Sequence, residues 1–345
     1  MRVLGISDLA RVERLEAEWR ELWERDPAAT PFQSPDWLIP WIGRLWGGGH
    51  LAFLALRHGE RLTAVAPLFL WGYGPAAPTI RLSWAGSGIS DYLGMTCEPG
   101  STGESAAAVL EWIRACPDWH TADLQEQRAG SPLLEAASGM AGWTVSPCSV
   151  CPTLELRANR DEQLAAGDAR FRRNLKIAEK RLRAAGRAEF VEANDGGHEE
   201  LLDELFRLHT GRWRERGEDG MLSSEKLEGF HREIARRFCT RGFLRLFVLH
   251  VEGSPIAVQY NFAAKGRVYA YLSGFDTAWS RVSPGALVLA HSIAAAIGEG
   301  AAVLDFLRKR EDFKYAWGAT DRENFRLSAA RGQAGVWPET CHESR

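Results

Sequence analysis

LRLFVLHVEGSPIAVQYNFAAKGRVYAYLSGF, residues 244–275, is the stretch that decides the fold. Three apolar runs, 244–251, 256–264 and 268–275, are separated by short turns that contain Gly253, Pro255 and Gly266. Turns of this kind join neighbouring strands, so the stretch predicts three consecutive antiparallel strands. An apolar helix over 284–297 and a strand over 303–307 follow. The order predicts an α/β unit.

The N-terminal half repeats a weaker version of this order. A helix is expected over 9–25, and a second helix has Ser34 as N-cap and Pro35 at its first position. A hairpin of strands at 51–57 and 62–71 follows, then a strand at 80–84, a helix at 105–114 and a strand at 121–125. We therefore expect a duplicated architecture with one domain over 1–155, a second over 156–335 and a tail over 336–345.

The composition is that of an ordinary globular protein. The chain has 345 residues, 45% hydrophobic and 25% charged, which suits two domains. Its net charge of -3 gives no global basis for binding DNA. The first ten residues lack the pattern of a signal peptide, and no run reaches the roughly 18 apolar residues that span a bilayer. A cytoplasmic location without a membrane span is expected.

The usual signatures of metal and nucleotide chemistry are missing from the sequence. Cys148 and Cys151 have the spacing of half a zinc site, but no second cysteine pair or nearby histidines follow, so we expect free thiols and no metal. The sequence contains no phosphate-binding loop of the Walker type, no dinucleotide fingerprint and no nucleophile elbow. Hydrolase and dehydrogenase activities are therefore disfavoured.

A strongly basic helix is expected over 170–187. Apolar residues at helical spacing form one stripe, and the rest of the helix is cationic. Such a face attracts a phosphate-rich ligand, or it is simply a solvated surface rich in arginine. The basic residues are Arg170, Arg172, Arg173, Lys176, Lys180, Arg181, Arg183 and Arg187.

Two segments of the C-terminal half could carry chemistry. The first is the helix start at 281–286, where unpaired backbone N–H groups could hold an anion; a plain helix start capped by Ser283 is the alternative. The second is 304–318, where Asp305 stands in an apolar strand and basic residues, Tyr315 and Trp317 follow. A buried carboxylate needs a partner, so Asp305 either orients a donor or forms a structural ion pair.

Two strands also present polar side chains at alternate positions. Gln259 and Asn261 share one face of their strand, as Tyr269 and Tyr271 do on the next. They could contact a substrate or face solvent.

Seven ordered motifs resemble the CelD/BcsL group of GNAT-fold acyltransferases, over about residues 10–330. They are Pro31-Phe-Gln-Ser-Pro-Asp-Trp37, Ser90-Asp-Tyr-Leu93, Glu252-Gly-Ser-Pro-Ile-Ala-Val-Gln-Tyr-Asn261, Tyr271-Leu-Ser-Gly-Phe-Asp276, Ser283-Pro-Gly-Ala-Leu287, Leu304-Asp-Phe-Leu-Arg308 and Phe313-Lys-Tyr-Ala-Trp-Gly318. The resemblance implies two tandem GNAT-like domains with mixed, largely antiparallel sheets. This tandem architecture is shared with the FemABX aminoacyl transferases.

The same resemblance implies transfer of an acyl group from acyl-CoA to an amine of a cell-envelope, lipid or sugar precursor. Against the usual GNAT phosphate loop, Arg281 and Ala286 fit and Pro284 replaces the first glycine. Expected donor-binding residues are Arg281, Ser283, Gly285, Ala286 and Arg308, and expected acceptor-binding residues are Asp91, Tyr92, Gln259, Asn261 and Tyr271.

Transfer to an amine needs a base, oxyanion stabilisation and an acid for the leaving thiolate. We assign these roles to Asp305, to Lys314, which falls where Fem-type enzymes carry a lysine, and to Tyr315. Two alternatives stay open at this point. One is Fem-like transfer from aminoacyl-tRNA, with the basic helix as phosphate contact, and the other is a non-catalytic GNAT scaffold.

Overall fold

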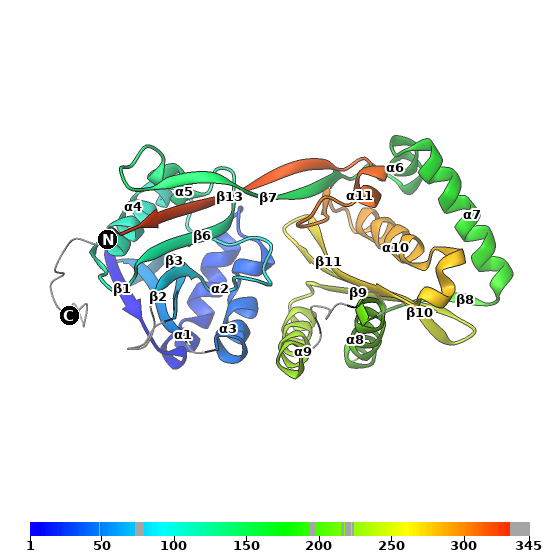
Figure 1. Cartoon of the computed structure of the whole chain (residues 1–345), viewed down its shortest axis with the longest axis horizontal. Coiled ribbons are helices and arrows are strands. Elements are labelled where there is room, and N and C mark those ends of the chain that lie inside the picture. The colour runs from blue at the N-terminus through cyan, green and yellow to red at the C-terminus, as the bar shows by residue number, and fades with distance from the viewer. Residues whose placement is uncertain are drawn as a thin grey trace. The chain divides into compact units, whose positions relative to one another are not determined.

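A computed structural model describes residues 1–47, 49–72, 79–193, 197–214, 217, 222 and 224–331 (Figure 1). The chain divides into two compact units. The first comprises Met1–Ser149 and the described residues from Glu323 onward, and the second comprises Val150–Arg322. The tail expected over 336–345 lies outside the described residues.

The first unit is built on a mixed sheet in which most neighbours are antiparallel. Its strands occur in the order β1 (Arg2–Ile6), β2 (His50–His58), β3 (Arg61–Trp71), β4 (Arg81–Trp84), β6 (Thr121–Arg128) and β13 (Thr320–Ala330), and β5 (Thr96–Cys97) pairs with β3. Only the β4–β6 pairing is parallel among these. The hairpin predicted over 51–71 is confirmed as β2 and β3.

Helices cover both faces of this sheet (Figure 1). They are α1 (Leu9–Arg14), α2 (Glu16–Arg25), α3 (Pro35–Arg44), α4 (Thr102–Ala115) and α5 (Pro132–Ala137), with a 3-10 turn, η1, at Pro31–Gln33. On one face Phe53 meets Trp19 of α2 at 5.0 Å between ring centroids. On the other, Leu54 and Leu56 pack with Leu110 of α4. Because both faces are covered, β2 and β3 are apolar almost throughout rather than alternating.

The single helix predicted over 9–25 is wrong in one respect. The Leu15 N–H donates to the carbonyl of Val12 at 3.0 Å, a tighter turn than an α-helix makes, so α1 ends and α2 begins there. The apolar stripe continues across the break, with Val12, Trp19 and Trp23 buried.

The second unit confirms the strands predicted over 244–275. Its sheet has the order β7 (Thr144–Glu155), β12 (Val303–Asp305), β11 (Arg267–Phe275), β10 (Ser254–Ala264), β9 (Leu244–Val251) and β8 (Ala188–Glu192). The β11–β12 pair is parallel, and the pairs on either side of it are antiparallel. The numbering shows that β7 and β13 each run across a boundary between the units.

Two layers of helices flank this second sheet (Figure 1). They are α6 (Arg160–Ala166), α7 (Ala169–Ala185), α8 (His198–Arg214), α9 (Glu225–Thr240), α10 (Pro284–Gly298) and α11 (Asp312–Ala316), with a 3-10 helix, η2, at Thr277–Val282. Phe262 of β10 contacts Phe238 of α9 on one face. On the other face Phe247 and Leu249 pack with Val288 of α10. The central helix α10 is therefore held against the strands that precede it in the chain.

Candidate functional site

The second unit contains a place where two parallel strands separate. β11 and β12 pair only at Arg267–Val303, Val268–Leu304 and Tyr269–Asp305. Beyond these pairs β12 ends, whereas β11 continues to Phe275 and leads through η2 into α10. Ligands of open α/β folds bind outside the carboxyl ends of strands where the chain turns into such a helix.

The α10 start differs in detail from the sequence-based expectation. Ser283 is the N-cap residue with φ 53° and ψ 55°, and its side chain makes no capping hydrogen bond. Its carbonyl instead accepts from the N–H groups of Ala286 and Leu287, at 3.1 and 3.2 Å. The hydroxyl is therefore not consumed by the helix. Asp276 caps η2 through the Ala278 N–H at 2.9 Å.

Gly285 and Arg281 border this helix start. A Cβ on Gly285 would lie 3.2 Å from Cδ1 of Phe275, so the glycine lets the helix approach the end of β11. The Arg281 side chain is exposed, and its carbonyl accepts from Nη1 of Arg181 at 2.8 Å. The helix start thus combines a partly exposed backbone with an exposed guanidinium, a combination suited to an anion.

Asp305 and Lys314 act together on one turn of the chain. Asp305 is 2% exposed; its Oδ1 accepts from the Leu307 N–H at 2.9 Å, and its Oδ2 lies 3.7 Å from Nη1 of Arg267. Lys314 is 3% exposed, and its ammonium donates to the carbonyls of Leu307, Arg308 and Lys309 at 3.3, 2.8 and 2.8 Å.

The turn that they hold is conformationally costly. Leu307 has φ 58° and Lys309 has φ 83°, a region that residues with a Cβ rarely occupy. Three donors match the three carbonyls, and Glu311 adds an ion pair at 3.3 Å. In this arrangement Lys314 holds the loop after β12 in place. The contribution of Arg308 is its carbonyl, which accepts one of the hydrogen bonds from Lys314.

Tyr315 belongs to a separate surface group. Its hydroxyl donates to Oδ1 of Asp321 at 2.7 Å, and Oδ2 of Asp321 accepts from Nη2 of Arg310 at 2.8 Å. Desolvation, followed by the hydrogen bond to Asp321 and then by its negative charge, raises the pKa of Tyr315. The hydrogen bond from Tyr315 lowers the pKa of Asp321. The phenol is thus engaged with Asp321 in this structure.

The polar residues of β10 are buried, so the solvent-facing alternative is wrong for Gln259 and Asn261. Nε2 of Gln259 donates to Oδ1 of Asn261 at 2.7 Å, and Nδ2 of Asn261 donates to Oγ of Ser292 in α10 at 2.5 Å. Both residues are at most 5% exposed. This chain of bonds ties β10 to α10 and so fixes the helix that starts at the donor end.

Tyr271 lies elsewhere, in an aromatic cluster. Its ring centroid is 5.2 Å from that of Phe262 and 5.7 Å from that of His231. The structure places Tyr271 on the α9 side of the sheet, whereas Gln259 and Asn261 meet α10. These three predicted acceptor residues do not form one site.

A pocket of about 530 Å³ lies beside the carboxyl end of β11. α8 contributes Phe206, Arg207, Leu208, Thr210, Gly211 and Arg214; α9 contributes Glu228; the β11–η2 junction contributes Phe275, Asp276 and Thr277. The charged residues of this lining were missed by sequence reasoning. The signal that could have found them is the spacing of Arg207, Gly211 and Arg214, which share a face of α8.

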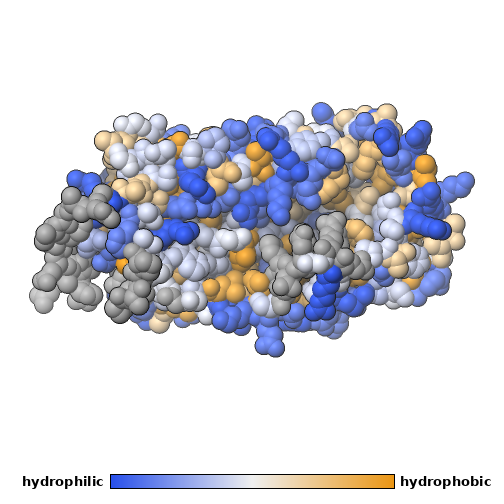
Figure 2. Space-filling model, in the orientation of Figure 1, coloured by the Kyte–Doolittle hydropathy of each residue, from blue (hydrophilic) through white to orange (hydrophobic). Residues whose placement is uncertain are grey.

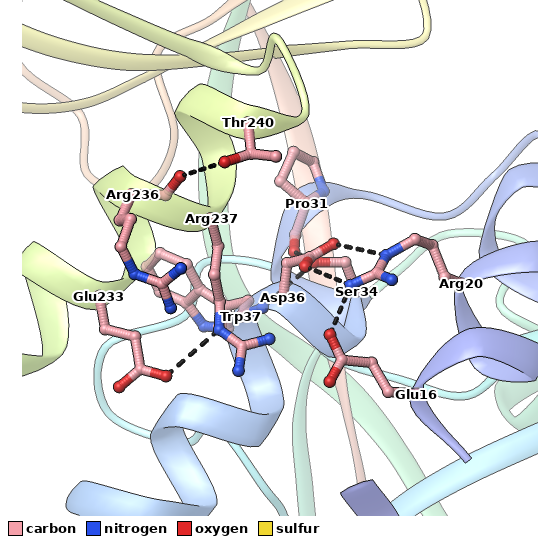
Figure 3. A network of polar contacts seen from close by, with 10 residues as sticks. All are labelled: Glu16, Arg20, Pro31, Ser34, Asp36, Trp37, Glu233, Arg236, Arg237 and Thr240. Atoms are coloured by element: carbon pink, nitrogen blue, oxygen red, sulfur yellow. Dashed lines mark hydrogen bonds and ion pairs between the residues drawn. The ribbon is translucent and has the colours of Figure 1, made fainter. Parts of the chain in front are cut away.

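In the first unit, the motifs around Trp37 and Ser90 meet. Ser34 caps α3 as predicted, accepting from the Trp37 N–H at 3.3 Å, and Arg20 joins Glu16 and Asp36 at 2.5 and 2.8 Å (Figure 3). Nε1 of Trp37 donates to Oγ of Ser90 at 2.9 Å. The second-unit residues in the same figure form their own contacts within α9, among them the Glu233–Arg237 ion pair at 3.2 Å.

Asp91 and Tyr92 are buried rather than displayed on a polar turn. Asp91 is 8% exposed, and its carbonyl accepts from Nδ2 of Asn324 at 3.0 Å. Tyr92 is 3% exposed and lies under the guanidinium of Arg128, 5.4 Å from the ring centroid. The same Asn324 amide donates to Oε2 of Glu126 at 2.9 Å. These residues make a buried polar cluster in the first unit.

Two further observations concern the part of the chain that the structure describes. It contains no group of three or more His, Cys, Asp or Glu side chains that could hold a metal ion. None of its helices combines the length and apolar character needed to cross a bilayer.

Comparison with known proteins gives a domain match in the second unit and a match of the fold. Residues 169–315 match the family model of the acetyltransferase (GNAT) domain. The fold of the whole chain is a tandem GNAT-like fold with mixed, mostly antiparallel strands, as in solved structures of that architecture. The fold class predicted from sequence is confirmed, and the match supports an acyltransferase of GNAT type.

The individual structures are distant in sequence. FemX has 12% identity and a TM-score of 0.68 over 94% of this chain and 97% of its own. The L-PGS structure from Bacillus licheniformis has 12% identity and a TM-score of 0.58, over 95% and 94%. The tandem GNAT protein of the clavulanic acid biosynthesis pathway has 14% identity and a TM-score of 0.50, over 96% and 100%. The search of curated proteins gave no match.

Proposed function

We propose that this chain is an N-acyltransferase that moves an acyl group from acyl-CoA to an amine. The observation that carries the proposal is the separation of β11 from β12 next to the start of α10. An extended thioester could lie between the separated strands, and its phosphates could lie at the helix start beside Arg281, Ser283 and Ala286. The GNAT domain match over 169–315 covers all of these elements.

The reaction forms a C–N bond and breaks the C–S bond of the thioester. The acceptor ammonium first loses a proton to water, the neutral amine attacks the carbonyl, and the nitrogen of the tetrahedral intermediate gives up a second proton as the leaving thiolate takes one up. Tyr315 is the proposed proton donor; its phenol is protonated at neutral pH, and its hydrogen bond to Asp321 would have to give way to one with the leaving group.

The contacts of Asp305 and Lys314 modify their proposed roles. Asp305 holds the Leu307 N–H, and all three donors of Lys314 have backbone acceptors. We therefore propose both as positioning residues that fix the turn between β12 and α11. A direct role for Asp305 as base and for Lys314 at the oxyanion would require these contacts to break.

The pocket lined by α8 and α9 is the proposed binding place of the acceptor amine. It opens beside Phe275, at the end of the strand that we assign to the donor. Glu228 supplies a carboxylate for an ammonium group, and Arg207 and Arg214 supply cations for an anionic part of the same molecule. In the first unit, the acceptor role expected for Asp91 and Tyr92 remains a proposal.

The finer identity is proposed from the sequence motifs alone. We propose the CelD/BcsL group within the GNAT acyltransferases, with the acceptor among cell-envelope, lipid or sugar precursors. The name of one solved structure of the same fold, the C-terminal domain of a putative lysylphosphatidylglycerol synthetase from Agrobacterium fabrum, fits an acceptor of lipid type.

Calorimetric titration with acetyl-CoA and with a long-chain acyl-CoA tests the donor. We expect binding to the wild type and at least about tenfold weaker binding to Ala286→Glu, because a carboxylate there repels the donor phosphates. Ala286→Gln is the matched control of equal size. A glutamate in the first turn favours the helix itself, so the loss cannot be ascribed to unfolding. Absence of heat with both donors contradicts the proposal.

A second candidate is transfer from aminoacyl-tRNA, as in the Fem proteins. It is favoured by the exposed cations of α7, which could contact phosphates. The same titration with a charged tRNA separates the two donors. If acyl-CoA is the donor, it should bind, and Ala286→Glu should weaken that binding.

A further inference from the structure

The exposed side of α7 is a row of cations. Arg173, Lys176, Lys180 and Arg183 follow one another at spacings of three and four residues, so they share a face, and Arg170 extends the row by a turn. All five side chains are exposed. From Arg170 to Arg183 the row is about 20 Å long, at about 1.5 Å per residue.

The row is not explained by contacts within the described residues. None of the ion pairs or side-chain hydrogen bonds found there involves any of these five residues. The remaining basic residues of the helix do have such contacts. Arg172 donates to the carbonyls of Ala165 and Gly167, and Arg181 donates to that of Arg281. Five like charges in one row repel one another, and an anionic surface would relieve that repulsion.

The opposite face of α7 is fixed in the core. Leu175, Ala178 and Leu182 are buried, and the ring of Phe171 lies 4.8 Å from that of Trp317. The helix cannot roll over to insert its apolar stripe into a partner. Whatever binds must therefore meet the cationic face as it stands.

One apolar residue lies within that face. Ile177, which lies between Lys176 and Lys180 in the sequence, is 41% exposed. By contrast, most large apolar residues of the chain are buried. At the right of the view in Figure 2, where Figure 1 draws α7, strongly hydrophilic and apolar residues lie side by side. Burial of Ile177 in an interface would remove apolar surface from water.

We propose that this face of α7 docks the protein on the surface of an anionic phospholipid bilayer. A flat row of cations matches a layer of negative headgroups, and each cation near such a surface contributes on the order of fivefold in affinity. Ile177 can enter the interfacial region. A nucleic acid offers Ile177 phosphates, sugars and bases but no apolar layer to enter, and the face carries no aromatic side chain on which bases could stack. The inference goes beyond the acyl transfer proposed above and would place a lipid-borne acceptor near the enzyme.

Co-sedimentation of the full chain with vesicles tests the docking. We expect binding to vesicles of phosphatidylcholine with about one third phosphatidylglycerol, weaker binding at high salt, and none to pure phosphatidylcholine. The triple variant Arg173→Gln, Lys176→Gln, Lys180→Gln should lose on the order of a hundredfold in affinity. The matched control Lys226→Gln, Arg236→Gln, Arg322→Gln removes the same charge from exposed positions elsewhere and should lose little.

The Ile177→Ser variant distinguishes lipid from nucleic acid. It should weaken vesicle binding severalfold and leave any RNA binding, measured by fluorescence anisotropy with tRNA, unchanged. Binding of tRNA but not of vesicles through the α7 cations overturns the proposal, and so does equal loss in the two triple variants. A thermal melt confirms that each variant is folded. Acyl-CoA titration of the α7 variants is expected to be normal, so failure of the docking and failure of the acyl transfer are separate results.

Discussion

At the residue scale, the clamp on Leu307 joins the two charged groups that the sequence marked for chemistry. Asp305 accepts a hydrogen bond from the Leu307 N–H, and Lys314 donates one to the Leu307 carbonyl. This residue, with φ 58°, is therefore held from both sides. Composition and spacing indicate that such charges are special. They cannot show which backbone groups the charges meet, because that depends on a turn whose dihedral angles the sequence does not reveal.

Lys314→Met should destabilise the second unit by about 2–4 kcal/mol, because three carbonyls lose a charged donor in a buried place. Lys309→Met removes the same charge from an exposed side chain and should cost less than about 0.5 kcal/mol. Urea unfolding measures both. If Lys314→Met is as stable as Lys309→Met yet has lost acyl transfer, the lysine acts in the chemistry and the clamp is not its main role.

His231 makes the stability depend on pH. It is completely buried in α9 beside Tyr260, and this burial, with a smaller contribution from His209, lowers the pKa of His231 to about 3. In the unfolded chain the imidazole titrates near 6.5, so between these values the unfolded state binds more protons. Stability contributed by the neutral ring is therefore lost as the pH falls below 6.5.

Between about pH 7.5 and pH 5 the wild type should lose about 2 kcal/mol through this group. His231→Phe keeps an aromatic ring in the cluster and should lack that part of the pH dependence. Denaturant unfolding at the two pH values tests this, and parallel pH profiles for the two proteins would rule out His231 as the cause.

At the element scale, the strands of residues 244–275 could be predicted because apolar runs and glycine turns coincide there. The strands β7 and β13 could not be predicted from the sequence. β13 begins with Thr320, Asp321, Arg322, Glu323 and Asn324, and its pattern looks like a loop because much of it is exposed. The α8 face that lines the pocket gave a signal in its spacing but an ambiguous one, since charged residues at helical spacing also describe an ordinary solvated face.

The contact between β11 and α8 depends on Gly274. A Cβ there would lie 2.6 Å from the backbone nitrogen of His209 and 2.8 Å from the carbonyl carbon of Leu208. Backbone atoms of a packed helix cannot move aside cheaply. Gly274→Ala should therefore cost about 1–3 kcal/mol and disturb the pocket beside β11.

Gly298→Ala provides the comparison for Gly274→Ala. This glycine ends α10, and a Cβ there meets nothing within 4 Å, so the substitution should be neutral or stabilise by up to about 1 kcal/mol. Thermal unfolding of the two variants is the measurement. Equal stability of both would show that α8 can shift away from β11.

At the scale of the whole molecule, the first unit contains chain from both ends of the sequence. β13 pairs with β6 through Asn324–Arg128 to Ala330–Thr121, and Leu327 is fully buried in the core of that unit. No local sequence pattern predicts that the chain pairs β13 with β6, because the paired residues are about two hundred positions apart.

Ending the chain after Arg322 should therefore unfold the first unit, although no residue before 150 is changed. The cut leaves the edge of β6 unpaired and removes Leu327 from the core. A chain that ends after Arg331 retains β13 and is the appropriate reference. Circular dichroism and limited proteolysis of the two proteins measure the effect, and a protease-resistant first unit in the shorter chain would refute it.

The late position of β13 in the sequence also determines the order in which the two units can complete folding during synthesis. A ribosome releases the second unit in full before residues 324–330 emerge, so that unit can fold while β6 still has an open edge. The first unit to be translated is then the last to be completed. An intermediate with an unpaired strand edge persists for the time needed to translate some two hundred residues, or roughly 10–40 s at about 5–20 residues per second. In a growing cell, chaperone contact with the nascent chain should concentrate on β6 during that interval.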